Sequence, residues 1–352
     1  MLTVRFIERR GAVLTPSGLA CLAGVPTVNI SNGCAHGCVY CYGRGYSGYP
    51  GEDVVLVYRD TAERVERELA RKRRRPLAVY FCPSCDAFQP LDAVLEQSYQ
   101  SMVAILDAGV GVEFVTKGAI PGRFLDLFSR HRGRVSGQVG LTTLDEALRA
   151  ALEPGAAPVA KRLRSISRLK EVGVSVSVRA DPLIHGVTDD ESSLAALMAA
   201  SRERGVTDIA ASYLFLRPAV TSSLKRHVAD RALMERILAP YARGFHFALR
   251  GGAGGGLALP EAIRRAGFEH LKQLAAGHGL QVHVCGCKNP DVASGRCHLV
   301  RDRTEENAGH RPQAATGLLW ETPPLSVAPA VKPGAASADT CDGTSGVPTT
   351  AS

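Results

Sequence analysis

The chain has 352 residues, of which 45% are hydrophobic and 22% charged, a composition that suits one large globular domain or two small ones. No apolar run approaches the roughly 20 residues that a membrane span needs, and the N-terminal residues lack the apolar stretch and cleavage site of a signal peptide. We therefore expect a cytoplasmic protein that does not cross a membrane.

The net charge of +8 permits a polyanionic partner, and part of the excess lies in the run "RKRRR" at residues 71–75. This run ends a segment with a helical pattern, where cations complement the negative end of the helix dipole. Charge alone therefore gives little support for nucleic-acid binding.

Short apolar runs typical of strands alternate with amphipathic helical patterns along most of the chain. The predicted strands are residues 26–30, 77–81, 112–116, 135–141, 174–178, 208–216 and 281–284. The predicted helices are residues 60–74, 91–108, 120–130, 158–172, 190–204 and 260–277. This alternation predicts an α/β fold whose parallel sheet curls into a full or partial barrel, with the chemistry at the C-terminal ends of the strands.

The composition divides the chain into four expected parts. These are an N-terminal segment (1–24), a core barrel (25–220), a C-terminal part of the core (221–308) and a tail (309–352). The tail is rich in Pro, Ala, Gly, Ser and Thr and has too little apolar content to pack, so we expect it to be disordered.

Most of the ten cysteines are grouped, at residues 34–41, 82–85 and 285–297. Grouping in a long chain without an export signal favours metal binding over disulfides. Cys21 and Cys341 stand alone and are interpreted as ordinary thiols.

Cys34, Cys38 and Cys41 form the motif C-x3-C-x2-C in the stretch "NISNGCAHGCVYCYGRGY". Three thiolates can hold a tetrahedral zinc ion with an open position, or three irons of a four-iron cluster whose fourth iron remains free. His36 or a distant cysteine could complete a structural zinc site. The motif by itself leaves both alternatives open.

The context of the motif decides between them. The loop follows the first predicted barrel strand, and Tyr40 places an aromatic residue directly before the third cysteine. This arrangement resembles the radical S-adenosylmethionine (radical SAM) superfamily. The resemblance implies a [4Fe–4S] cluster on Cys34, Cys38 and Cys41, whose unligated iron binds SAM, and reductive cleavage of SAM to methionine and a 5′-deoxyadenosyl radical. It also implies a partial (β/α)6 barrel and an electron donor such as flavodoxin or ferredoxin, and it leaves His36 as a loop residue.

The resemblance is strongest to the spore photoproduct lyase-like branch, in "CPSCDAFQP", "FVTKG", "GLTTLDEALRAALEPGAAP" and "HVCGCKNPD". It implies that Tyr40, Ser84, Lys117 and Thr142 contribute to the SAM site, with Ser84 near the amino acid moiety and Lys117 near the carboxylate. Arg162 is a further candidate for that carboxylate, although a solvated helix arginine is an equal alternative.

The resemblance also assigns a role to Cys82, which stands two residues before Ser84. Lyases of this branch return a hydrogen atom to the substrate from a cysteine at the matching position, and an S–H bond is weak enough for that purpose. Alternatively, Cys82 and Cys85 ligate a second metal or are buried and inert. We assign no role to Cys85.

A late group, Cys285, Cys287 and Cys297, has His298 alongside. We expect these cysteines to form a second metal site, an iron–sulfur cluster that His298 or Cys85 could complete. A structural zinc ion is an alternative. Contact between their thiols and the substrate is a further alternative.

The sequence thus predicts a radical SAM enzyme that abstracts hydrogen from a substrate carbon. We expect a redox-neutral epimerisation or rearrangement of a small molecule, such as a natural-product sugar or nucleoside. A nucleic-acid lesion lyase of the spore photoproduct type is the alternative, and it is not favoured because aromatic residues do not alternate with a basic stripe. A non-catalytic iron–sulfur or zinc protein is a third interpretation.

Overall fold

A computed structural model describes residues 2–18, 20–248 and 255–294 of the chain. All described elements lie within the first unit of the chain, Met1–Arg301. The predicted tail, residues 309–352, lies outside the described residues. Of the helices that are described, none is long and apolar enough to span a bilayer.

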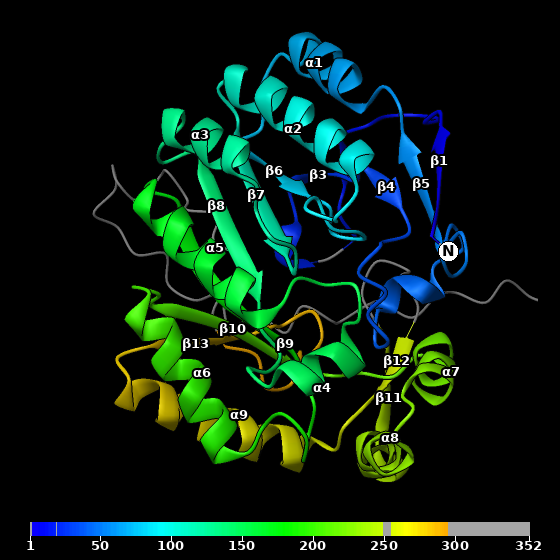
Figure 1. Cartoon of the computed structure of the whole chain (residues 1–352), viewed down its shortest axis with the longest axis vertical. Helices are drawn as coiled ribbons and strands as arrows, with labels where there is room; N and C mark the ends of the chain where they lie inside the picture. The colour runs from blue at the N-terminus through cyan, green and yellow to red at the C-terminus, as the bar shows by residue number, and fades with distance from the viewer. Residues whose placement is uncertain (1, 19, 249–254, 295–352) are drawn as a thin grey trace, which may run out of the picture. The chain divides into compact units, whose positions relative to one another are not determined.

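An eight-stranded sheet occupies the centre of the first unit (Figure 1). Its strands run in the spatial order β13, β10, β9, β8, β7, β6, β3, β2, and all neighbours are parallel except β2 and β3. The strands are β2 (Thr15–Pro16), β3 (Pro26–Val28), β6 (Ala78–Phe81), β7 (Gly111–Thr116), β8 (Val135–Gly140), β9 (Ser175–Leu183), β10 (Asp208–Tyr213) and β13 (Gln281–Val284). In the part of the chain that is described, the edge strands β2 and β13 do not pair with each other, so the parallel sheet is a partial barrel.

Helices connect successive strands and cover the sheet (Figure 1). They are α1 (Thr61–Arg71), α2 (Asp92–Asp107), α3 (Gly122–Arg130), α4 (Glu146–Leu152), α5 (Val159–Glu171), α6 (Glu191–Glu203), α7 (Pro218–His227), α8 (Arg231–Leu238) and α9 (Glu261–Gly277). Helix α2 packs on β7, α5 on β8 and β9, and α9 on β13. Helix α3 shows why these segments are helical, because Phe124 and Phe128, four residues apart, share its buried face.

Several elements were not predicted. Strands β1 (Thr3–Ile7), β5 (Val54–Tyr58) and β4 (Ser31–Asn32) form a separate three-stranded sheet, and β11 (Phe245–Ala248) pairs with β12 (Gly255–Ala258). Three short 3-10 helices, η1 (Ala20–Leu22), η2 (Tyr42–Gly45) and η3 (Ala239–Arg243), also occur. Strand β1 gives little sequence signal because most of its side chains are exposed.

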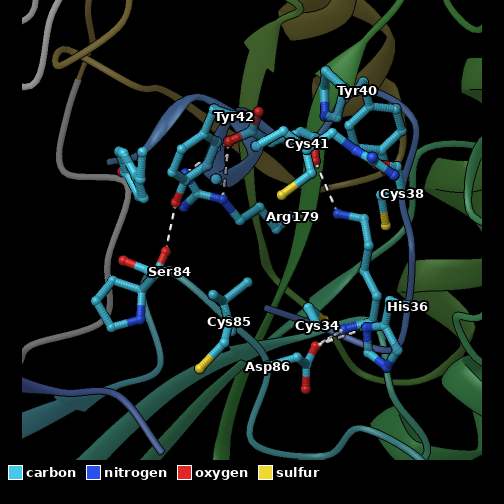
Figure 2. Close-up of a pocket in the computed structure, with 18 of the residues that line it drawn as sticks. Cys34, His36, Cys38, Tyr40, Cys41, Tyr42, Ser84, Cys85, Asp86 and Arg179 are labelled. Carbon is cyan, nitrogen blue, oxygen red and sulfur yellow. Dashed lines mark hydrogen bonds and ion pairs between the residues drawn. The ribbon is translucent and has the colours of Figure 1, made fainter. Parts of the chain in front are cut away.

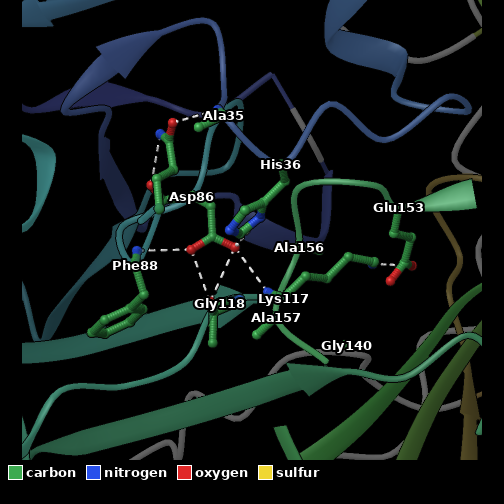
Figure 3. A network of polar contacts seen from close by, with 12 residues as sticks. Ala35, His36, Asp86, Phe88, Lys117, Gly118, Gly140, Glu153, Ala156 and Ala157 are labelled. Carbon is green, nitrogen blue, oxygen red and sulfur yellow. Dashed lines mark hydrogen bonds and ion pairs between the residues drawn. The ribbon is translucent and has the colours of Figure 1, made fainter. Parts of the chain in front are cut away.

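The buried carboxylate of Asp86 ties the loop after β6 to the end of β7 (Figure 3). It accepts hydrogen bonds of 2.8 Å from the Phe88 N–H, the Thr116 hydroxyl and the Lys117 N–H. The same carboxylate lies 3.4 Å from Nδ1 of His36, in the cysteine loop. Asp86 therefore holds three separate segments in one arrangement.

We expect Asp86→Ala to lower the free energy of unfolding by about 2–4 kcal/mol, because it leaves several buried donors without an acceptor. Urea unfolding followed by circular dichroism measures the change. Asp126→Ala, which removes an exposed carboxylate on α3, is the matched control. Equal stability of the two variants would contradict this role for Asp86.

Candidate active site

A cavity of about 440 Å³ opens beyond the C-terminal ends of β6, β7, β9 and β10. Cys34, Cys38 and Cys41 all line it, and Figure 2 shows Ser84 and Cys85 across the open space from Cys38. The volume is within the usual range of small-molecule and cofactor sites. The cavity lies at the end of the sheet where the sequence places the chemistry.

Tight backbone turns bring the three cysteines of the loop to this cavity. The N–H of Gly37 bonds the carbonyl of Cys34 at 3.3 Å, and the N–H of Cys41 bonds the carbonyl of Cys38 at 3.2 Å. Gly37 has a φ of +60°, a conformation that glycine adopts without steric cost. Between these turns, the Val39 N–H bonds the carbonyl of Leu152 at 2.9 Å and fixes the loop to the end of α4.

The thiols fit an iron–sulfur cluster better than a single zinc ion. Burial raises the pKa of Cys34 well above its ordinary value and that of Cys38 to about 12, so their thiolates need nearby positive charge, which either bound metal would supply. Within the described ranges, no three His, Cys, Asp or Glu side chains converge on one ion position. A tetrahedral zinc requires that convergence, whereas a cluster gives each thiolate its own iron.

Glu153, which the sequence did not single out, is the centre of a buried polar network. Its carboxylate accepts hydrogen bonds from the hydroxyls of Tyr40 and, at 3.0 Å, Thr142. It lies 2.5 Å from Nη2 of Arg162 and 4.0 Å from Nζ of Lys117. Burial opposes its ionisation, but Lys117 and Arg162 outweigh that effect and lower the pKa of Glu153.

The predicted SAM-binding residues therefore fall into two groups. Tyr40, Ser84 and Lys117 line the cavity, whereas Thr142 and Arg162 are not among its described lining residues and lie behind it on Glu153. Arg162 also donates to the carbonyls of Ala157 at 2.7 Å and Gly140 at 3.0 Å and is 1% exposed. The alternative of a solvated helix arginine is thus wrong, and both residues are placed to position the cavity wall.

The structure places the 82–85 cysteines differently from the expectation. Cys82 is fully buried in the hydrophobic core with a φ of +53°, and it is not among the described residues that line the cavity. Cys85 lines the cavity, and its thiol contacts that of Cys82. The Cys82 N–H bonds the Val28 carbonyl at 2.7 Å, which keeps Cys82 in the sheet layer.

The late cysteines reach the same cavity. Cys285 and Cys287 line it, and so does Cys21 from η1, which the sequence treats as isolated. The Cys21 N–H donates to the Cys287 sulfur at 3.3 Å, which joins two segments 266 residues apart. Cys297 and His298 lie outside the described residues.

Charged and aromatic side chains complete the wall. Asp181 lies 2.7 Å from Nζ of Lys288 and 2.8 Å from Nη2 of Arg179. Nζ of Lys288 lies 5.8 Å from the ring centre of Tyr42 and 5.6 Å from that of Phe215. This group could not be predicted from the sequence, because its members come from distant segments.

The sequence model of the Radical SAM superfamily matches residues 28–198. This chain carries a radical SAM domain. The family uses a [4Fe–4S] cluster and SAM, and its enzymes require a reductant and a substrate. The match spans strands β3 to β9, the part of the sheet in which the cysteine loop, Lys117 and Glu153 lie.

Two curated proteins illustrate the sequence similarity of this chain to known proteins. A radical SAM Nα-GlyT isomerase of Pseudomonas phage M6 is 29% identical over 160 residues, which is 45% of this chain and 33% of that protein. The uncharacterized protein Rv2578c of Mycobacterium tuberculosis is 28% identical over 200 residues, which is 54% of this chain and 59% of that protein. The chain thus matches only a third to three-fifths of these relatives' lengths.

Solved structures show the same fold. A spore photoproduct lyase complexed with dinucleoside spore photoproduct matches with a TM-score of 0.61 and 16% identity, covering 79% of this chain and 81% of that one. A mutant lyase with bound AdoMet (SAM) and the same dinucleoside also has a TM-score of 0.61, at 13% identity over the same shares. The radical SAM domain with its partial barrel is therefore of the spore photoproduct lyase type in fold.

Gly155 packs closely against the cysteine loop, so a substitution at this position tests how the loop is positioned. Its N–H bonds the His36 carbonyl at 2.9 Å, and a Cβ at Gly155 would lie 2.1 Å from the Ala35 carbonyl oxygen. We expect Gly155→Ala to displace the loop, lower the free energy of unfolding by about 1–3 kcal/mol and reduce the iron bound after reconstitution.

Thermal unfolding and iron analysis of the reconstituted protein measure these effects. Gly277→Ala is the control, because a Cβ at Gly277 meets no atom within 4 Å. Normal iron content and stability in Gly155→Ala would show that this contact does not position the loop.

Proposed function

We propose that Cys34, Cys38 and Cys41 hold the catalytic [4Fe–4S] cluster of a radical SAM enzyme that catalyses a redox-neutral isomerisation or epimerisation of a small molecule. The main support for this proposal is that these three cysteines line one cavity at the C-terminal ends of the strands. The isomerase relative and the lyase-type fold support a reaction that leaves the oxidation state of the substrate unchanged.

When bound and reduced, the cluster supplies the electron that splits SAM into methionine and a 5′-deoxyadenosyl radical. The chain's own residues bind and orient SAM and shield the radical. Lys117 places a cation at the cavity wall, close enough to Glu153 to stay ordered, and we assign it to the SAM carboxylate. Ser84 and Tyr40 line the same cavity and are assigned to the SAM site with it.

Thr142 and Arg162 support this site from behind. They bond the Glu153 carboxylate, which also accepts from the Tyr40 hydroxyl. Their role is to fix Tyr40 and, through charge, Lys117. We therefore assign them as positioning residues for the SAM site and not as residues that touch SAM.

We assign return of the hydrogen atom to Cys85, because Cys85 and not Cys82 is among the described residues that line the cavity. Once a substrate carbon had lost a hydrogen atom, Cys85 would return one to it, with the Cys85 S–H bond breaking as the new C–H bond forms. The resulting thiyl radical returns to a thiol with one electron from the enzyme's reductant and one proton. Cys82 lies in the core, where its thiol contacts that of Cys85, and we assign it no part in the reaction.

A nucleic-acid lesion is the second candidate substrate. The observation that favours it is the aromatic and cationic wall of the cavity, where Tyr42, Phe215 and Lys288 could receive a nucleobase. Activity on lesion-containing oligonucleotides that falls steeply with salt concentration would support this substrate over a small uncharged molecule.

We expect anaerobically reconstituted, dithionite-reduced protein to convert SAM to 5′-deoxyadenosine, and Cys38→Ala to reduce the yield to that of a protein-free blank. Liquid chromatography with mass spectrometry measures the product. Cys341→Ala, a change at an isolated cysteine outside the domain, is the matched control and should keep full activity. Absence of the nucleoside from a sample with a spectroscopically verified reduced cluster would favour a non-catalytic metal protein.

We expect Cys85→Ala to form 5′-deoxyadenosine within about threefold of the unmutated protein, a barrier change of roughly 0.6 kcal/mol, while losing turnover of substrate to product. Cys82→Ala should retain both, apart from a loss of stability from the core cavity it creates. The paired assays are nucleoside yield and deuterium incorporation into product in D2O. If Cys82→Ala lost the deuterium incorporation and Cys85→Ala kept it, the assignment would be reversed.

A further inference from the structure

Basic residues gather at the end of the sheet opposite the cavity. The segments that enter β6, β7 and β8 meet at this end, because the three strands are parallel neighbours. We define the basic face as the seven cations of these segments, which are Arg71, Lys72, Arg73, Arg74, Arg75, Arg132 and Arg134. The net charge of the chain is +8, so the positive charge of this one face is comparable to that of the whole chain.

Stabilisation of a helix end does not explain the basic face. Helix α1 ends at Arg71, short of the predicted end at residue 74, and the backbone of Lys72 is extended. Cations stabilise a helix through its dipole only within the last turn. Arg73, Arg74 and Arg75 therefore lie in the loop beyond the helix, where the dipole does not account for them.

Contacts across this end of the sheet bring cations from separate segments together. Nη1 of Arg75 donates to the carbonyl of Ala108 at 2.7 Å, in the turn that enters β7. Arg134 packs over the same turn, because a Cβ on Gly109 would lie 2.9 Å from Nη1 of Arg134. Guanidinium groups from the loops before β6 and β8 thus lie on one turn between them.

The charge of the basic face is not compensated by carboxylates. Six of the seven cations are exposed, and Arg134 is half-buried. Among the described residues, none of the seven forms an ion pair, and Asp107 at the end of α2 pairs instead with His131 at 3.5 Å. Like charges gathered in this way repel one another, and a bound polyanion would remove that repulsion.

The residue types of the basic face fit phosphate groups better than a protein surface. Six of the seven cations are arginine, whose planar guanidinium pairs with two phosphate oxygens at once. Protein interfaces have apolar or aromatic anchors at their centre. In the described loops before β6, β7 and β8, the exposed large apolar side chain is Leu77, and Phe, Tyr and Trp do not occur.

We propose that the basic face binds the phosphate backbone of a nucleic-acid duplex. Because these loops present no aromatic ring for a base to stack on, the contact is to the backbone and independent of sequence. Strand β7 has six residues, and at the usual rise per residue it separates the basic face from the cavity by roughly 20 Å. The duplex thus holds the enzyme in place and is not the molecule that reacts in the cavity.

Fluorescence anisotropy of a short labelled DNA duplex, titrated with the reconstituted full-length protein, measures this binding. If about five phosphates are neutralised, the logarithm of the affinity should fall with the logarithm of the salt concentration with a slope of about −4.5. K72Q/R73Q/R74Q should weaken binding at least about tenfold and reduce the steepness of this slope by roughly 2 to 3.

K161Q/K225Q/R243Q is the matched control, because it removes the same charge from exposed positions on α5, α7 and η3 and should keep the affinity. Circular dichroism verifies that both variants are folded, and both should form 5′-deoxyadenosine at the rate of the unmutated protein. Equal loss of affinity in the two variants, or binding that does not respond to salt, would overturn the proposal. Displacement of the duplex by polyglutamate more readily than by unlabelled DNA would also overturn it and would assign the basic face to an acidic protein.

Discussion

The Glu153 carboxylate is the contact on which the site depends. It is buried, and a buried charge persists only if partners compensate its lost hydration. Lys117 and Arg162 provide the charge, and the hydroxyls of Tyr40 and Thr142 provide hydrogen bonds. Because these partners come from the cysteine loop, the strand ends and α5, one ion network sets their relative positions.

Asp86 makes a complementary connection from the other side of the loop. It binds the backbone at the end of β7 and contacts His36, between the first two cysteines of the motif. Together the two carboxylates fix the cysteine loop at both sides, and neither needs to touch a cofactor to do so. The thiols are consequently presented to the cavity by a rigid frame, which a cluster with one open iron requires.

Much of the fold could be predicted from the sequence because its signals are local. Each predicted strand and helix of the sheet layer has a counterpart, since apolar runs and helical periodicity come from neighbouring residues. The motif of Cys34, Cys38 and Cys41 is equally local, and its spacing indicated the superfamily that the radical SAM match shows. Strand β1 could not be predicted in the same way, because most of its side chains are exposed.

The rest of the site depends on contacts between distant segments. Glu153 is a single carboxylate in "LEPG", and its role is visible only once Tyr40, Lys117 and Arg162 meet around it. The same holds for Cys21, which stands alone in the sequence and meets Cys287 only in the folded chain. Cys82 shows the converse. Its motif position predicted a cysteine at the site, but only the folded chain shows that Cys85 and not Cys82 is among the described residues lining the cavity.

The central claim is that Cys34, Cys38 and Cys41 hold a cluster whose open iron binds SAM. Electron–nuclear double resonance of the reduced protein, with SAM carrying 17O in its carboxylate, tests it most directly. We predict a hyperfine coupling between 17O and the cluster that is absent from Cys38→Ala. A reduced cluster in the unmutated protein that shows no coupling at saturating SAM would contradict the account.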